Sequence, residues 1–332
     1  MQIISLLIPR TVRLPEAMIE DLLWDPVMAA EVLLGFKLDV FQACRLRTYW
    51  HCTDVMDSSG WSSGKTVVDW IFCALRNLLI PEQDVGVYFP VFQTGKETFW
   101  RYFYTCQSKI FQAHLGRMTQ DGDEAGEGKV QGAAAFKVYY RNGGSLLMPA
   151  PSFMKRAETQ ASLRFNTLVV EEWPKIDVNA NGNEGIAQLI GRCTKASWNQ
   201  HHPIWGNHII FSGTAETVLH PGVKRYKQFV REQASGNPNW EHVSFCYKDY
   251  SSRECAPGIS FKEKFRIEKK ILSLRSQLSP ADWLGEGLGI WSENGEGWFN
   301  EELLMAAVNN GARAGLTPEL GREGRWSDGV ME

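Results

Sequence analysis

The sequence predicts an α/β protein in which helices flank a central, mostly parallel β-sheet. Short apolar runs of strand length alternate with helix-like patterns along much of the chain, as they do where helices connect parallel strands. The runs at 168–170 and 209–211 are apolar throughout, as strands buried on both faces are. A glycine-serine loop at 58–64 joins another strand-like run directly to a helical pattern. These observations favour a sheet with helices on both faces.

The expected elements follow this alternation along the chain. Residues 14–47 are expected to be helical, with turns near Pro26 and Gly35. The helix expected at 66–80 repeats apolar residues at spacings of three and four and stops at Pro81. The other expected elements are strands at 48–56, 84–92, 167–173, 208–215 and 240–250, a hairpin at 135–150, and helices at 96–111 and 186–196.

The chain of 332 residues is expected to divide near Pro257. Residues 1–256, which begin with the helical segment at about 1–47, form the predicted α/β domain. Residues 257–332 form a small linker or lid region, where a helical stripe is followed by the glycine-rich stretch "ADWLGEGLGIW".

Composition and charge argue against several classes of protein. The net charge of −3 gives no basic footprint over the whole chain, so any nucleic-acid contact has to come from a local patch. The seven cysteines form no C-x-x-C pair, which indicates reduced thiols in a cytosolic compartment rather than disulfides or a zinc site. No secretory leader and no apolar run long enough to cross a bilayer is visible, so no membrane contact is expected.

The stretch "SSGWSSGKT" at 58–66 has the order that phosphate binding requires: a strand, a glycine-serine turn, Gly-Lys-Thr and a helix. The first glycine of the usual G-x-x-x-x-G-K-[ST] pattern is Ser59 in this chain. A serine fits there if its backbone does not need a positive φ. Gly-Lys-Thr alone arises often by chance, but the strand before it and the helix after it favour a functional loop.

Each residue of such a loop has a defined role. Lys65 is expected to reach the β- and γ-phosphates, and the Thr66 hydroxyl to hold Mg²⁺. The bound molecules are therefore expected to be ATP and Mg²⁺. The loop groups expected to surround the phosphates are those of Gly60, Ser62, Ser63 and Gly64.

Two acids follow the apolar run "TLVV". Glu171 and Glu172 stand where a buried strand ends, and open α/β sheets bind ligands at that edge. Glu171 is expected to lie on the metal side and Glu172 to act as the catalytic base. A strand that ends in Glu-Glu is usually only a solvated edge, so the assignment depends on Lys65 about a hundred residues upstream.

The run "HIIFSGTA" offers a third element of the site. It places the hydroxyls of Ser212 and Thr214 beyond the end of a buried strand, where they could sense the γ-phosphate. An ordinary turn after a strand is an equally good interpretation of this segment alone.

The order "LDVFQ", "SSGWSSGKT", "TLVVEEW", "IIFSGTA" resembles the ATPase domain of the large terminase subunit of tailed bacteriophages. The resemblance covers roughly residues 38–298 and implies a RecA-like P-loop ATPase fold of the additional-strand, catalytic-glutamate type. It implies that Gln42 contacts adenine, that residues 59–66 are Walker A, and that 168–171 are Walker B. It also implies that Glu172 is the catalytic glutamate and 212–214 the coupling motif.

The resemblance also implies partners and a place of action. These are double-stranded DNA, a portal protein, a small terminase subunit and further copies of this chain in a ring that acts in the host cytoplasm. In dilute solution a monomer is expected.

The chain departs from the usual pattern of the family at the loop, at the finger arginine and in its second domain. Trp61 stands where Walker A often has an arginine, so an arginine finger is expected from Arg164, with Arg156 as the reserve. The family's nuclease domain is expected to lie outside this chain, so no nuclease activity is expected from it.

Two other functions fit parts of the pattern. A helicase-like translocase would need a second ATPase-like lobe, and the residues after Pro257 are too few for one. A nucleotide-binding scaffold would not need a base at Glu172. ATP-driven movement of double-stranded DNA into a procapsid is therefore the function that the sequence favours.

Overall fold

The structure is a computed structural model of the chain. It describes residues 16–61, 63–106, 108–119, 135–149, 165–175, 204, 206–216, 220, 222–246, 248–249 and 261–291.

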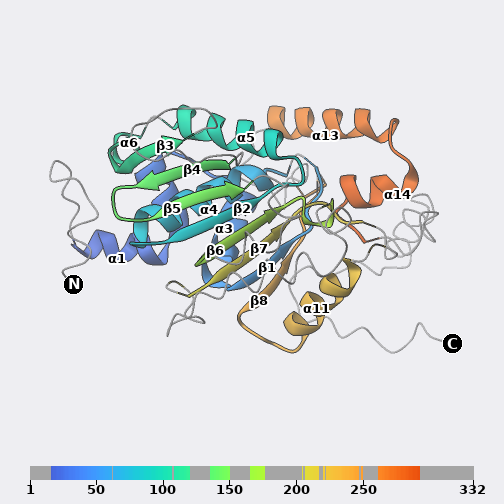
Figure 1. The fold of residues 1–332 in the computed structure, drawn as a ribbon. Helices are drawn as coiled ribbons and strands as arrows, with labels where there is room; N and C mark the ends of the chain where they lie inside the picture. The colour runs from blue at the N-terminus through green and yellow to red at the C-terminus, as the bar shows by residue number, and fades with distance from the viewer. Residues whose placement is uncertain are drawn as a thin grey trace.

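A mostly parallel β-sheet forms the centre of the described part of the chain (Figure 1). It has eight strands, and only β4 runs against its neighbours. The sheet prediction is thereby confirmed. In spatial order the strands are β3 (Leu115–Thr119), β4 (Ala135–Tyr140), β5 (Ser145–Pro149), β2 (Asp84–Tyr88), β6 (Thr167–Glu171), β7 (His208–Ser212), β1 (Asp54–Asp57) and β8 (Trp240–Val243).

Strand β7 lies between β1 and β6, the two strands whose ends carry the glycine-serine loop and the paired acids. β7 pairs in parallel with β6 on one side and with β1 on the other. The chain after β1 is the glycine-serine loop, and the chain after β6 begins with Glu172. Because the three strands are parallel, the segments that follow them meet at one edge of the sheet. This is the additional-strand arrangement expected of the fold.

The helices connect the strands and lie against the sheet. Figure 1 shows α5 and α6 over the β3–β5 end of the sheet and α11 beside β8. The helical elements are α1 (Glu16–Trp24), α2 (Pro26–Ala29), η2 (Ala30–Leu34), α3 (Val40–His51), α4 (Lys65–Leu79), α5 (Phe92–Thr105), α6 (Lys109–His114), α11 (Val223–Ala234), α13 (Phe261–Arg275), α14 (Pro280–Asp282) and η3 (Trp283–Gly287).

The strand expected at 48–56 is largely wrong. Helix α3 continues to His51, and the strand begins only at Asp54. The helix begins at a capping box. The Asp39 carboxylate accepts a hydrogen bond from the backbone N–H of Gln42, and the side-chain oxygen of Gln42 accepts one from the backbone N–H of Asp39. Trp50 is fully buried and donates to the Leu23 carbonyl, so tertiary packing overrides the strand preference of the aromatic residues.

Other sequence predictions agree with the structure more closely. The helix expected at 66–80 is α4, and the hairpin expected at 135–150 is β4 and β5, joined by a turn in which Gly143 has φ 87°. The helix expected at 186–196 and the boundary expected near Pro257 lie outside the described residues.

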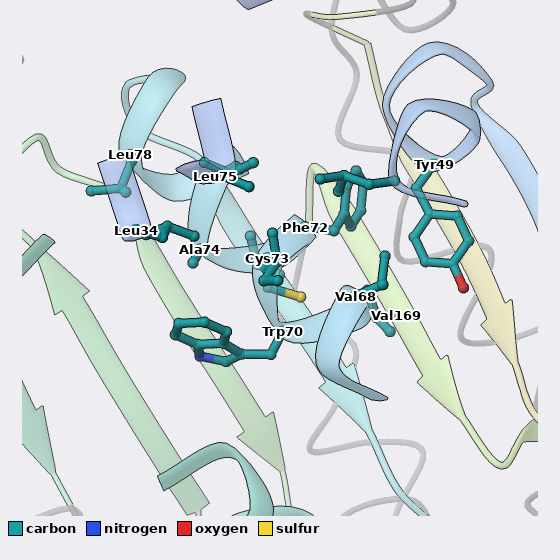
Figure 2. Packing of buried hydrophobic residues seen from close by; sticks show 14 of the residues in the cluster. Leu34, Tyr49, Val68, Trp70, Phe72, Cys73, Ala74, Leu75, Leu78 and Val169 are labelled. Carbon is teal, nitrogen blue, oxygen red and sulfur yellow. The ribbon is translucent and has the colours of Figure 1, made fainter. Parts of the chain in front are cut away.

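The strands alternate their side chains between two hydrophobic cores. Val55, Val169 and Ile210 face a core formed with α3 and α4, whereas Leu168 and Phe211 face a second core with α11. Figure 2 shows the first core, where side chains of α4 lie over the strands. Burial on both faces fixes the register of the central strands and hence the level at which each strand ends.

No helix among the described residues is long and apolar enough to cross a membrane.

Candidate functional site

The glycine-serine loop turns into α4 through a glycine that no other residue could replace easily. Gly64 has φ 76°, in the left-handed region that favours glycine, and it is the N-cap of α4. A Cβ atom at Gly64 would come within 2.7 Å of the Gln42 side-chain nitrogen. The expected adenine contact Gln42 therefore lies against the loop.

A buried ion pair holds the glycine-serine loop to α3 and to the end of β1. The Arg45 guanidinium of α3 donates from Nε to the Asp57 carboxylate at the end of β1, and both side chains are fully buried. Arg45 also donates to the Ser63 carbonyl at 2.8 Å and to the Ser59 hydroxyl at 3.0 Å. Three donors of one side chain thus connect helix, strand and loop.

Asp57 has two further donors besides Arg45. The Tyr49 hydroxyl donates to it at 2.8 Å, and the Ser59 backbone N–H donates at 2.9 Å. Burial raises the pKa of Asp57, but Arg45, Lys65 and the bonds from Ser59 outweigh that effect, and the pKa is lowered. The carboxylate is therefore ionised, and each of its oxygens accepts a hydrogen bond.

Ser59 uses its side chain where the usual pattern has a glycine. Its hydroxyl accepts from the Phe245 backbone N–H at 2.9 Å, as well as from Arg45. The neighbouring Gly60 N–H donates to the Phe245 carbonyl at 2.9 Å. Ser59 has no positive φ, so a serine costs nothing there and joins the loop to the chain after β8.

Lys65 points back into the loop in this structure. Its ammonium group donates to the Ser59 carbonyl at 2.5 Å and to the Gly60 carbonyl at 3.2 Å. Burial lowers its pKa, and the carboxylates of Asp57 and Glu172 act in the opposite direction. The negative charges at the ends of β1 and β6 thus lie within electrostatic reach of the Lys65 ammonium group.

Glu171 is a buried carboxyl at the last position of β6. It pairs in register with Ser212 of β7 and is 1% exposed, and its Oε1 has no hydrogen-bond partner. Burial and the neighbouring Asp69 carboxyl raise the pKa of Glu171 well above its usual range. Asp69 lies in the second turn of α4 and is also fully buried, and burial raises its pKa. Two carboxyls so close together cannot both be ionised without a cation.

Glu172 has an unusual backbone. Its φ is 49°, and among the described residues only Glu82 is another non-glycine residue with a positive φ. A left-handed conformation at a residue with a side chain is uncommon and often marks a functional position. The Glu172 carboxylate lies 3.1 Å from the Lys175 ammonium group. The tight turn therefore places the carboxylate of Glu172 beside Lys175.

The segment after β7 joins the other two strand ends. The Gly213 N–H donates to the Asp57 carbonyl at 3.0 Å, and a Cβ at Gly213 would come within 2.9 Å of the Pro174 ring. Thr214 is 1% exposed and follows directly. This segment is therefore in contact with both the end of β1, just before the glycine-serine loop, and the turn that contains Glu172.

Residues 283–291, which we call the lid segment, lie against the loop. The Trp61 N–H donates to the Glu286 carbonyl at 2.6 Å. A Cβ at Gly60 would come within 2.6 Å of the Gly287 carbonyl oxygen. Such close backbone contact requires glycine on the loop side.

The lid segment also contacts the ends of β7 and β8. A Cβ at Gly285 would collide with the Ala215 carbonyl, and the Ser244 hydroxyl donates to the Gly289 carbonyl at 3.1 Å. Four segments thus meet at this edge of the sheet, and the lid segment covers them.

The sequence-predicted residues are partly brought together at this edge. The structure collects there Gln42, Gly60, Ser63, Gly64, Lys65, Thr66, Glu171, Glu172 and Thr214. Ser62, Arg164 and Arg156 lie outside the described residues.

Sequence reasoning missed Arg45, Asp57 and Asp69. Asp57 could have been found from the sequence, because it is the last residue before the loop. Asp69 could also have been found, since it is an acid within the apolar stripe of a helix, four residues after Lys65. Arg45 could not, because its partners lie in other elements.

No protein-family model matches the sequence, and no curated protein matches it. The structure is similar to the large terminase of a thermophilic bacteriophage, with a TM-score of 0.50 and 10% identity over 76% of this chain and 53% of that chain. It is also similar to a mutant ATPase domain of the Thermus phage P74-26 large terminase, with a TM-score of 0.50 and 12% identity over 80% of this chain and 99% of that domain.

The chain has the fold of a phage large terminase ATPase domain. It spans about half the length of the first of these two relatives. That relative has also been solved with ATP-γ-S, in a structure with a TM-score of 0.49 and 11% identity over 76% of this chain and 52% of that one.

The buried ion pair allows a test of how the loop is held. Arg45→Met leaves the Asp57 carboxylate buried without its main counter-charge, which should lower the free energy of unfolding by about 3–5 kcal/mol. The measurement is denaturant unfolding followed by circular dichroism. The double variant Arg45→Met/Asp57→Asn removes both charges and should lose less.

The exposed Lys37–Glu31 pair provides the matched control. Lys37→Met should change the free energy of unfolding by no more than about 1 kcal/mol. A loss of similar size in Arg45→Met would show that the buried pair does not hold the loop.

Proposed function

We propose that this chain is the ATP-hydrolysing motor of a viral terminase, which moves double-stranded DNA into a procapsid. The observation that supports it best is the grouping of Lys65, Glu171 and Glu172 at one edge of the sheet, where both acids act on the lysine's pKa. A phosphate-binding lysine and two acids in this arrangement suit hydrolysis of a nucleoside triphosphate. The fold and the sequence motifs support the same interpretation.

The residues at this edge fit Mg²⁺ bound together with phosphate. Mg²⁺ prefers oxygen ligands and usually takes only one or two from the protein when it binds with phosphates. The Thr66 hydroxyl and the buried Glu171 carboxyl, whose Oε1 has no partner, are the oxygens that we assign to it. Bound there, Mg²⁺ would neutralise the charge that develops on the phosphoryl oxygens.

The protein side chains divide the remaining chemistry. The Lys65 ammonium group would exchange the Ser59 and Gly60 carbonyls for phosphate oxygens. Glu172 would orient a water molecule and accept its proton as the water attacks the γ-phosphate. The amide of Gln42 would hold the base, next to Gly64.

The DNA and the protein partners belong to the same proposal. The sequence motifs favour double-stranded DNA, a portal protein, a small terminase subunit and a ring of further copies acting in the host cytoplasm. In such a ring an arginine of one copy completes the site of the next, and Arg164 is our candidate for this finger. A helicase-like translocase is the alternative, and strand separation by the chain would favour it.

The direct test is ATP hydrolysis by the chain with and without double-stranded DNA. We expect Mg²⁺-dependent hydrolysis that DNA increases, and we expect Lys65→Ala to reduce it at least about a hundredfold while circular dichroism is unchanged. Hydrolysis that Lys65→Ala leaves intact, or none by the unaltered chain with DNA at high protein concentration, would contradict the proposal.

Substitutions of Glu171 and Glu172 should affect different steps of ATP hydrolysis. Glu172→Gln should keep nucleotide affinity and lower kcat by about two to four orders of magnitude, because the base is lost. Glu171→Gln should instead raise the Mg²⁺ concentration needed for half-maximal activity. The measurements are ATP titration and kcat at a series of Mg²⁺ concentrations, and the reverse pattern would exchange the two roles.

A further inference from the structure

A single lysine stands among acids from three segments of the site. The Lys175 ammonium group lies 3.1 Å from the carboxylate of Glu172, which stands three residues earlier in the chain. Glu216, which follows β7, and Glu286, in the lid segment, also act on the charge of Lys175. Lys175 thus forms an ion pair with the β6 turn and is also attracted by acids of the segment after β7 and of the lid segment.

The backbone around both members of the closest pair is held in a defined turn. Glu172 is held at φ 49°, and the Lys175 N–H donates to the Glu172 carbonyl at 2.9 Å. Between them Trp173 is fully buried, with its ring 5.9 Å from Phe211 and 5.8 Å from Trp291 of the lid segment. A turn anchored in this way fixes the backbone positions from which the two charged side chains extend.

The charges around Lys175 depend on one another. Partial burial lowers the pKa of Lys175, but Glu172, Glu286 and Glu216 outweigh it, so the pKa is raised and the lysine stays charged. Burial raises the pKa of Glu286, and Lys175 lowers it. If the lid segment moves away, Lys175 loses the charge of Glu286, and Glu172 then competes with one acid fewer for the lysine.

We propose that Lys175 is a positioning residue that orients the carboxylate of Glu172 and makes this orientation depend on where the lid segment lies. The proposal rests on the function proposed above, in which Glu172 is the base. An exposed Lys–Glu pair three residues apart usually contributes little to stability, and we assign none to this pair. Its effect is on the direction of one carboxylate, and small errors in such a direction are costly for catalysis.

The experiment compares Lys175→Met with Lys175→Arg and with the control Lys37→Met, in the full chain with Mg²⁺, ATP and double-stranded DNA. Lys175→Met should lower kcat by about 10- to 100-fold, because the base is misaligned, with KM for ATP within about twofold and an unchanged Tm. Lys175→Arg keeps the charge and should recover most of kcat. Lys37→Met, which breaks an exposed ion pair that includes none of the site residues, should behave as the unaltered chain.

Two double variants test the connections. Adding Lys175→Met to Glu172→Gln should cause no further loss, because the group that Lys175 orients is already inactive. Glu286→Gln should change kcat when Lys175 is present and leave it unchanged in Lys175→Met.

Each result decides one part of the proposal. A kcat of Lys175→Met within about twofold of the unaltered chain, or losses that multiply with Glu172→Gln, would overturn the positioning role. An equal effect of Glu286→Gln with and without Lys175 would overturn the link to the lid segment. If the unaltered chain hydrolyses no ATP, the proposed function fails and the positioning role fails with it, whereas an active chain with an active Lys175→Met refutes the positioning role alone.

Discussion

The buried pair of Arg45 and Asp57 is the constraint on which the rest of the site depends. It joins α3, the end of β1 and the loop before α4 through one guanidinium group. An uncompensated charge at either position would be costly, so the pair permits few arrangements of the three elements. With the loop fixed in this way, α4 begins at Lys65, whose ammonium group lies within electrostatic reach of the acids at the ends of β1 and β6. A local electrostatic requirement thereby positions residues that are far apart in the chain.

Much of this site could be predicted from the sequence, because its signals are local. The loop from residue 58 to 66 and the acids at 171 and 172 are short patterns next to buried strands, and the structure has those strands at 54–57 and 167–171. The strand expected from residue 48 failed because burial of Trp50 against another helix outweighs the strand preference of aromatic residues. The role of Arg45 could not be predicted from the sequence either, because its hydrogen-bond partners lie in other elements and only the fold brings them near.

The lid segment gives the same edge of the sheet a second set of contacts. Its backbone meets the glycine-serine loop at Gly60 and Trp61 and the segment after β7 at Ala215, without side chains in between. Backbone contacts of this kind cannot adjust by a change of rotamer, so a shift of the loop has to move the lid segment or break the contact. Lys175 adds a charged connection between the lid segment and Glu172. The glycine-serine loop, the turn at Glu172 and the lid segment are therefore mechanically connected in this fold.

A crystal structure of the chain with Mg²⁺ and a non-hydrolysable ATP analogue would test the central claim most directly. The account predicts that Lys65 leaves the carbonyls of Ser59 and Gly60 and contacts the phosphates, while the Arg45–Asp57 pair keeps its hydrogen bonds. It also predicts that Glu171 lies on the metal side and Glu172 nearer the γ-phosphate. A nucleotide bound elsewhere, with Lys65 still on the two carbonyls, would contradict the account.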